Sequence, residues 1–235
     1  MASAGNRAVA ILVGAVTVGA VALLATTSHE VGAAFSNHPG AAVGFLLLTV
    51  GLQAASLTGF GSSISVAGIG MIATGMVLGV GPAVLFAIVA SLVHALKKRP
   101  APHKAAFNAG AFVLAAGAAA AFYQAIEGPT TGRLGQLLIA EGAACVFVIV
   151  NLGLLTLAMS AAERAQPFRI WRQRLAWLMP HYLAFGPLAF VAMLAEQRFG
   201  PVGLLVGAAA PVGLTILLGY SLARVRSAQP NLQLS

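Results

Sequence analysis

The sequence predicts an all-α integral membrane protein, a polytopic helical bundle with about eight transmembrane helices and both ends in the cytoplasm. Three observations support this prediction: 59% of the 235 residues are hydrophobic, only 8% are charged, and the charges fall between long apolar runs. Soluble domains carry about 25% charged residues, so most of this surface must face lipid. Backbone in lipid has to satisfy its own hydrogen bonds, as helices and closed barrels do. The apolar runs are far longer than the ~10-residue alternating segments of barrel strands, so we expect helices.

A spanning helix needs about 20 residues, and eight apolar segments of roughly that length can be read along the chain. They cover residues 8–26, 40–57, 63–79, 82–96, 105–126, 134–161, 176–195 and 201–223. The third and fourth are short and nearly continuous. Proline is tolerated in the first turn of a helix, so Gly81-Pro82 predicts a tight turn between them. A re-entrant pair is the alternative.

The basic residues orient these segments. Eleven of the thirteen lysines and arginines fall on one side of an eight-span bundle, mainly in 97–104 and 163–174. Basic loops stay cytoplasmic, so 1–226 is predicted to be one transmembrane domain and 227–235 a short cytoplasmic tail. Merging the third and fourth spans would move Arg7 outside. Residues 1–27 could instead be a signal peptide, but their apolar stretch of about 18 residues exceeds the usual 7–15.

The loop before the seventh span combines an apolar stripe with arginines. Its i, i+3, i+7 spacing predicts a short helix at the membrane interface, with aromatic rings among the headgroups and arginines on anionic lipid phosphates. An orientation loop with ordinary interfacial aromatic residues is the alternative. The stripe is Phe168, Trp171 and Leu175, and the arginines are Arg169, Arg172 and Arg174.

Glu141 is the one acidic residue inside a predicted span, roughly 10 Å from its outer end. A charge near the bilayer centre costs about 2.5–3.5 kcal/mol on insertion scales, so this carboxyl needs a partner, a water-filled cavity or a proton. We therefore consider a ligand, ion or proton site at Glu141, with Tyr123 and Gln124 beside it. A neutral or interfacially solvated structural acid is the alternative. Further candidate partners are Arg133, Gln136 and Arg198.

Spans four to eight each carry a hydrogen-bonding side chain in their inner third. We call this set the inner polar layer: His94, Asn108, Asn151, His181, Tyr182 and Tyr220. Hydrogen bonds between helices, worth about 0.6 kcal/mol each, would account for it. Alternatively, the layer rearranges when the outer half binds something and so passes a signal inward. A third interpretation is that the layer lines a transport path.

Several functions are excluded by what the sequence lacks. The chain has no aspartate, hence no Ser-His-Asp triad or aspartyl dyad, and no HExxH, GxSxG or P-loop motif. We therefore predict neither an enzyme nor a cofactor. Cys145 is the one cysteine, which rules out a disulfide framework. His29 and His38 are too few for a metal site. The net charge of +8 lies in loops between apolar segments, so we predict no nucleic-acid partner.

Short motifs follow one another in an order that suggests a family. They are Gly81-Pro82, Phe107-Asn108, Val150-Asn151, Trp171-Arg172, Pro180-His181-Tyr182, Gly186-Pro187 and Gly219-Tyr220. This order, over about 77–223, resembles the N-terminal multi-span membrane region that precedes HD-GYP phosphodiesterase and GGDEF cyclase domains in bacterial cyclic-dinucleotide signalling proteins.

The resemblance implies a sensor in the bacterial inner membrane whose cytoplasmic output domain makes or breaks cyclic di-GMP. Asn108, Asn151, Pro180, His181, Tyr182 and Tyr220 match recurring positions of the family, which more often has asparagine in place of His181. Only nine residues follow Arg226, so the resemblance implies the sensor part without the catalytic part.

Three functions remain open at this stage. The leading hypothesis is a sensory module that binds a small ligand or senses the membrane and relays this through spans seven and eight. The second is a small transporter or substrate-binding membrane subunit with Glu141 as its functional acid. The third is a scaffold that packs against another membrane protein. The expected partners are the lipid bilayer with its anionic headgroups, a cytoplasmic signalling protein and a second copy of the chain.

Overall fold

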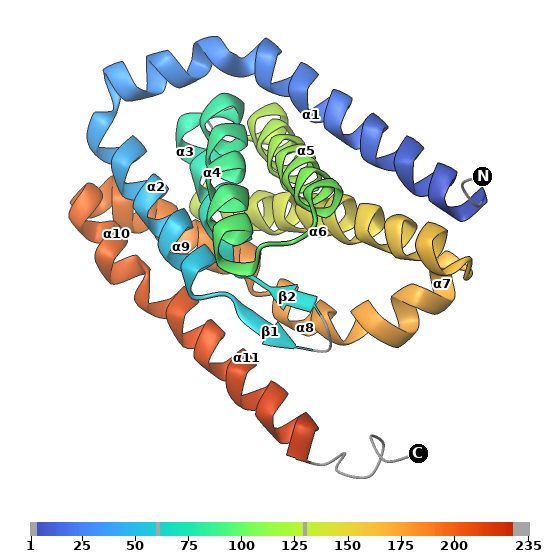
Figure 1. Cartoon of the computed structure of the whole chain (residues 1–235). Coiled ribbons are helices and arrows are strands. Elements are labelled where there is room, and N and C mark those ends of the chain that lie inside the picture. Colours follow the sequence, from blue (N-terminus) through green and yellow to red (C-terminus); the bar gives the residue numbers. More distant parts are fainter. Residues whose placement is uncertain (1–3, 60–61, 129–130, 228–235) are drawn as a thin grey trace.

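The computed structural model describes residues 4–59, 62–128 and 131–227, which are helical apart from short connections and one small hairpin (Figure 1). The longer helices are α1 (Ala4–Asn37), α2 (Pro39–Ala54), α3 (Ala67–Leu78), α4 (Val80–Lys98), α5 (Pro102–Ile126), α6 (Arg133–Glu163), α9 (Phe185–Phe199), α10 (Pro201–Gly207) and α11 (Ala209–Ser227). Five helical segments are long and apolar enough to cross a membrane: Arg7–Asn37, Val80–Lys98, Pro102–Ile126, Arg133–Glu163 and Pro167–Phe199. The chain is a helical membrane protein.

Helix α1 is a long, curved arm along one side of the bundle (Figure 1). Its 34 residues span about 51 Å. The sequence prediction of a span over 8–26 followed by a loop was wrong, because the helix continues to Asn37. The stretch after Thr26 has no proline, and Pro39 is the first residue that cannot continue a helix. His29 and Glu30 therefore lie on a helix.

A two-stranded hairpin replaces the expected junction of the second and third spans. Strands β1 (Leu57–Gly59) and β2 (Ser62–Ile64) pair antiparallel, with Leu57 opposite Ile64. Glycine next to β-branched residues disfavours helix here. Helices α2 and α3 are consequently only about 24 and 18 Å long, short of the ~30 Å hydrocarbon core.

The chain reverses sharply between α3 and α4. The tight turn predicted at Gly81-Pro82 lies two residues earlier, at Gly79, whose φ of +92° favours glycine. A Cβ placed on Gly75 would lie 3.6 Å from that of Ala83, whereas eight residues along a continuous helix span about 12 Å. Helices α3 and α4 therefore fold back on each other as a helical hairpin.

Glu30 joins α1 to the start of α4. Its Oε2 accepts a hydrogen bond from the backbone N–H of Gly81 at 2.8 Å. A carboxylate is favourable at a helix N-terminus, where N–H groups are unpaired and the helix dipole is positive. A Cβ on Gly81 would meet the Cβ of Glu30 at 2.8 Å, so only glycine allows this approach.

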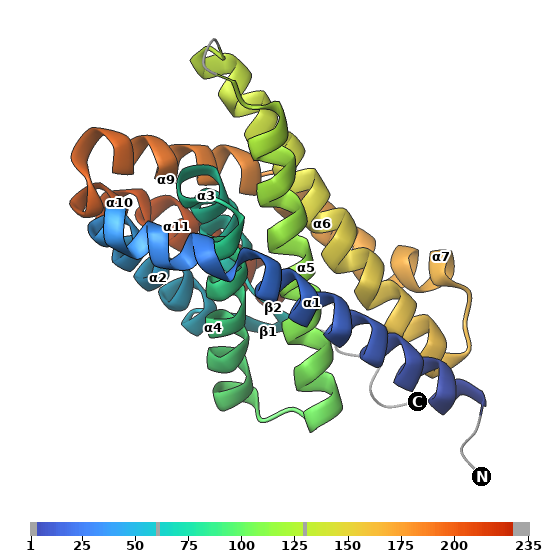
Figure 2. The same cartoon turned by 90° about the horizontal axis from the view of Figure 1, so that it is seen from above.

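Small residues let the central helices pack closely. Ala115, Ala116, Ala119 and Ala120 on α5 are each at most 1% exposed, as expected where membrane helices approach backbone to backbone. Helices α5 and α6 run side by side in opposite directions (Figure 2). The links from α4 to α5 and from α6 to the next segment therefore lie at one end of this pair, which we call the basic end.

Residues 167–182 form an irregular helical segment, which we call the wall segment. It consists of α7 (Pro167–Ile170), a π-helical turn (Trp171–Leu175), a 3₁₀ turn (Ala176–Leu178) and α8 (Met179–Tyr182). The predicted stripe does not share one face, since Phe168 is 68% exposed and Leu175 is 2% exposed. A π turn adds one residue per turn, so Ile170 and Leu175, five apart, are both buried, and Leu178 is buried after them.

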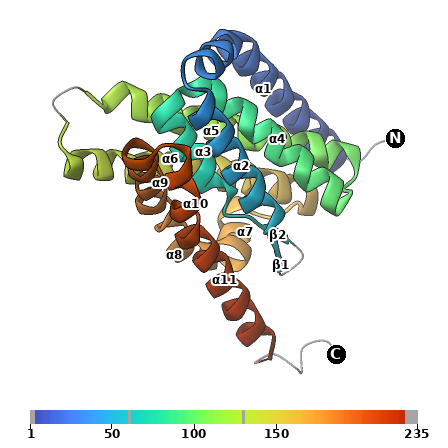
Figure 3. The same cartoon turned by 90° about the vertical axis from the view of Figure 1, so that its left-hand side faces the viewer.

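The last predicted span is broken into α10 and α11. Helix α10 packs on α2, where a Cβ on Gly44 would lie 2.7 Å from Leu204 Cδ1. Helix α11 then runs away from the rest of the bundle (Figures 1 and 3).

Candidate functional site

A cavity of about 1170 Å³ lies at the basic end of the bundle, above the ~300–1,000 Å³ that ligand pockets usually have. We call it the polar cavity. Helices α1, α2, α4, α5 and α6 contribute to its lining, together with the wall segment and the residues that lead into α3. Segments between Val9 and Tyr182 therefore meet around this space.

Along α5 and α6 the lining changes from charged to amide to aromatic side chains. On α5 it presents Lys104, Asn108 and Phe112, each four residues after the last, so that they share one helix face. On α6 the lining presents Phe147, then Asn151 four residues later, and Glu163 at the end of the helix. Both helices thus offer a charged residue at the basic end, an asparagine in the middle and a phenylalanine at the far end.

Four of the six predicted inner-polar-layer residues line this cavity: His94, Asn108, Asn151 and Tyr182. The other two do not. The ring of His181 packs edge-on to Trp177 with centroids 6.1 Å apart, and its buried Nδ1 has no hydrogen-bond partner within the described ranges. Tyr220 is 59% exposed on α11. The structure therefore brings together the part of the layer carried by α4, α5, α6 and the wall segment.

A hydrogen-bonded group at the cavity includes two residues that the sequence analysis missed. Gln53, at the end of α2, is completely buried. Its Oε1 accepts from the Ser65 hydroxyl at 2.8 Å, and its Nε2 lies 3.5 Å from His94 Nδ1. The Ser65 oxygen in turn accepts from the N–H of Ala67, where α3 begins. A glutamine inside an apolar segment was the available signal, since such residues are costly in lipid.

Basic side chains dominate the charged end of the lining. Lys98, Lys104 and Arg174 line it with a single acid, Glu163. Arg174 binds that acid through two contacts, of 2.8 and 3.0 Å. The charged end therefore keeps a positive balance.

Lys97, next to the cavity residue Lys98, has a structural role. Its ammonium donates to the carbonyls of Ala54 and Ser56 at 2.6 and 3.1 Å. These carbonyls lie at the C-terminal end of α2, where a cation is favourable. Lys97 thereby ties α4 to the end of α2.

The two side chains predicted beside Glu141 make hydrogen bonds to other residues. Tyr123 donates to the Met193 sulfur at 3.6 Å, and Gln124 donates to the carbonyl of Gly75 at 2.9 Å. Glu141 instead lies where α6 crosses α9, against Gly186. Its Oε2 is buried without a hydrogen-bond partner among the residues that the structure describes.

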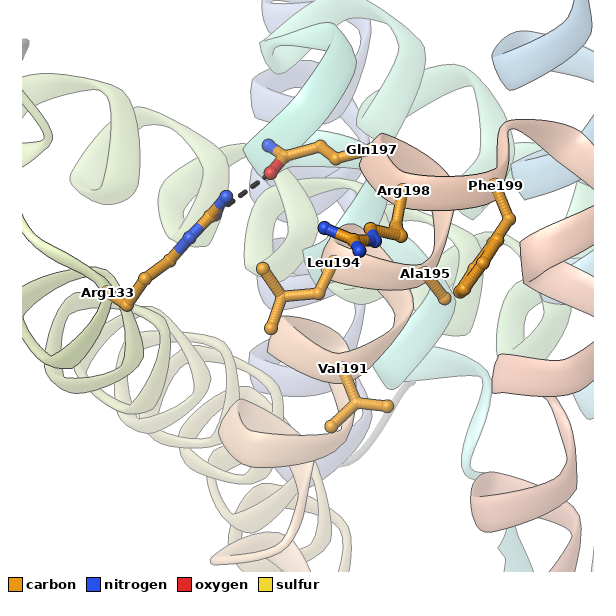
Figure 4. A pocket seen from close by; sticks show the side chains of 7 residues that line it. All are labelled: Arg133, Val191, Leu194, Ala195, Gln197, Arg198 and Phe199. Atoms are coloured by element: carbon orange, nitrogen blue, oxygen red, sulfur yellow. Dashed lines mark hydrogen bonds between the residues drawn. The ribbon is translucent and has the colours of Figure 1, made fainter.

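The arginines considered as partners of Glu141 lie in a separate depression of about 620 Å³ (Figure 4). Arg133 donates to Gln136 and Gln197 at 3.1 and 3.0 Å. Gln136 also donates to Glu127 at 3.3 Å. Arg198 lines the same depression next to Gln197. These polar groups hold the α5–α6 connection against the end of α9.

Comparisons with known protein families, curated proteins and solved structures found no match for this chain. Function lies in sites rather than in folds. The polar cavity and Glu141 are the sites that bear on the function of this chain.

Proposed function

We propose that this chain is the ligand-binding, sensory part of a signalling system in the bacterial inner membrane, and that the polar cavity is its binding site. The observation that supports this most is the cavity itself, about 1170 Å³ and lined by hydrogen-bonding side chains. Polar residues within membrane segments are expensive and are retained where they bind or conduct something. This proposal moves the ligand from the outer half, where the sequence suggested it, to the basic end.

The irregular backbone beside the cavity supports the same proposal. Non-helical backbone at membrane depth is tolerated only where it is buried in protein or lines a water-filled space. Ser65 follows the β1–β2 hairpin and lines the cavity. The proposal includes eight crossings with both ends in the cytoplasm. The extended residues before α3 then complete its crossing, and the basic loops on either side of the cavity share the cytoplasmic face.

The wall segment is the proposed relay. Its residues Arg174, Trp177 and Tyr182 line the cavity, and the chain continues directly into α9. π-Helical turns inside helices occur frequently at functional sites. A ligand that contacts this segment would change its position and with it that of α9. An output domain, encoded in a neighbouring reading frame or in a longer form of this chain, would receive the signal.

Native mass spectrometry of the full chain, purified from bacterial membranes, tests the binding site. We expect a bound small molecule on the wild-type protein and its loss from Ala158→Trp, because Ala158 lines the cavity and an indole would fill part of it. Leu157→Trp is the matched control, since Leu157 is the adjacent residue and is 47% exposed. A wild-type protein with an empty cavity, or equal occupancy in both variants, would contradict the proposal.

A transporter is the second candidate function. The buried Oε2 of Glu141, which has no hydrogen-bond partner among the described residues, favours it. In vesicles loaded with a pH-sensitive dye, an imposed membrane potential would then drive proton entry. We expect Glu141→Gln to abolish this entry, because an amide cannot take up and release the proton. Glu163→Gln, which alters an exposed ion pair, should leave it unchanged. Proton entry no faster than in protein-free vesicles would eliminate this candidate.

A further inference from the structure

The lining of the polar cavity specifies a chemical class of ligand, an inference that rests on the function proposed above. We propose that the cavity binds an anionic lysolipid: one acyl chain, a hydrogen-bonding glycerol-type linker and a phosphate head. The phosphate lies at the basic end, the linker among the asparagines and the chain end between the phenylalanines.

The positive balance at the basic end selects the head group. Lys104 lies in the first turn of α5 and faces the cavity in the same row as Asn108. Hydrogen bonds from a lysine ammonium to phosphate are charge-assisted and roughly twice as strong as neutral ones. A positively charged head would be repelled at this end of the lining, and an uncharged head would form weaker hydrogen bonds there than a phosphate.

The middle of the cavity selects the linker. Asn108 and Asn151 each lie four residues, or about 6 Å along the helix, from the phenylalanine that follows in their row. Ser91 and His94 of α4 line the same space. A plain alkyl chain would leave the side-chain amides of Asn108 and Asn151 unpaired and desolvated, which costs about 1–3 kcal/mol per group. Ester and hydroxyl groups pair with them.

The far end of the cavity selects the acyl chain. The rings of Phe112 and Phe147 lie with centroids 6.4 Å apart and close the two rows. Leu152 and Gly68 line the same region. Burying apolar chain against these side chains contributes about 0.8 kcal/mol per CH₂. The two rows end at this aromatic pair, which places the chain end there.

Trp177 provides a direct test, because it lines the cavity and Trp171 does not. These are the two tryptophans of the chain. In full-length Trp171→Phe, a lysophosphatidic acid with a dibrominated acyl chain should quench Trp177 fluorescence saturably. In Trp177→Phe, the remaining Trp171 should show only weak, non-saturating quenching. Competition by unbrominated lipids then ranks the head groups and linkers.

We expect lysophosphatidic acid to compete at least tenfold better than monoacylglycerol, which lacks the phosphate, and better than hexadecyl phosphate, which lacks the linker. Lys104→Gln should weaken binding of the brominated probe about tenfold and Lys104→Arg much less. Arg172→Gln is the control, because Arg172 belongs to the wall segment but not to the lining. Thermal unfolding of each variant separates lost binding from lost folding.

The outcomes distinguish the ligand class from the proposed function. Saturable quenching with equal competition by monoacylglycerol, or with unchanged affinity in Lys104→Gln, overturns the anionic lysolipid and leaves a binding cavity. Equal competition by hexadecyl phosphate overturns the linker assignment. Absence of quenching at Trp177, together with another small molecule found by native mass spectrometry, also overturns only the class. If Trp177 is not quenched and native mass spectrometry finds no bound small molecule, the proposed function is overturned as well.

Discussion

Gly186→Ala is expected to lower the Tm of the detergent-purified chain by about 2–12 °C. An added Cβ at this position would lie 2.5 Å from the Cα and 2.8 Å from the backbone nitrogen of Glu141. Backbone atoms cannot rotate away as a side chain does, so α6 and α9 would have to separate. Overpacking of this kind costs about 1–3 kcal/mol, and each kcal/mol shifts the Tm of a chain this size by about 2–4 °C.

The matched control is Gly153→Ala on the same helix α6, where an added Cβ meets nothing within 4 Å. Alanine favours helix over glycine by about 1 kcal/mol, so this variant should keep or raise the Tm. The change from glycine to alanine is thus predicted to lower the Tm at position 186 and to keep or raise it at position 153. Equal Tm values for the two variants would show that Glu141 and Gly186 are not in contact and that α6 and α9 cross elsewhere.

Gln53→Leu is expected to lower the free energy of unfolding by about 2 kcal/mol and to reduce ligand occupancy of the polar cavity. Leucine is apolar and cannot replace the hydrogen bonds to Ser65 and His94. Each buried group left unpaired costs about 1–3 kcal/mol, partly offset where the cavity admits water. Thermal unfolding measures the first effect, and native mass spectrometry the second.

A double-mutant cycle with Ser65→Ala isolates the Gln53–Ser65 hydrogen bond. Residues in direct contact show coupling of about 0.5–3 kcal/mol, so the double variant should be less destabilised than the sum of the single variants. Gln166→Leu, at an exposed glutamine, should change stability by no more than about 0.5 kcal/mol. Strict additivity of Gln53→Leu and Ser65→Ala would refute the hydrogen bond.

The elements that the sequence mispredicted share a physical cause. The loop expected after residue 26 is helical, since charges such as Glu30 can be accommodated on a helix by a distant partner, here the N–H of Gly81. The hairpin at Leu57–Ile64 and the π turn at Trp171–Leu175 depend on pairing and packing with other segments. Local propensity carries no information about such partners.

Composition and the placement of charges sufficed, from the sequence alone, to identify a helical membrane protein and to single out His94, Asn108, Asn151 and Tyr182. Only the tertiary structure decided that these residues surround one cavity with Gln53, and that Tyr123 and Gln124 donate to Met193 and Gly75 rather than to Glu141. The reason is that lipid and protein interior are both apolar. A membrane helix therefore need not differ in sequence between its lipid-facing and buried faces, and the side chains that meet are determined by how the helices pack.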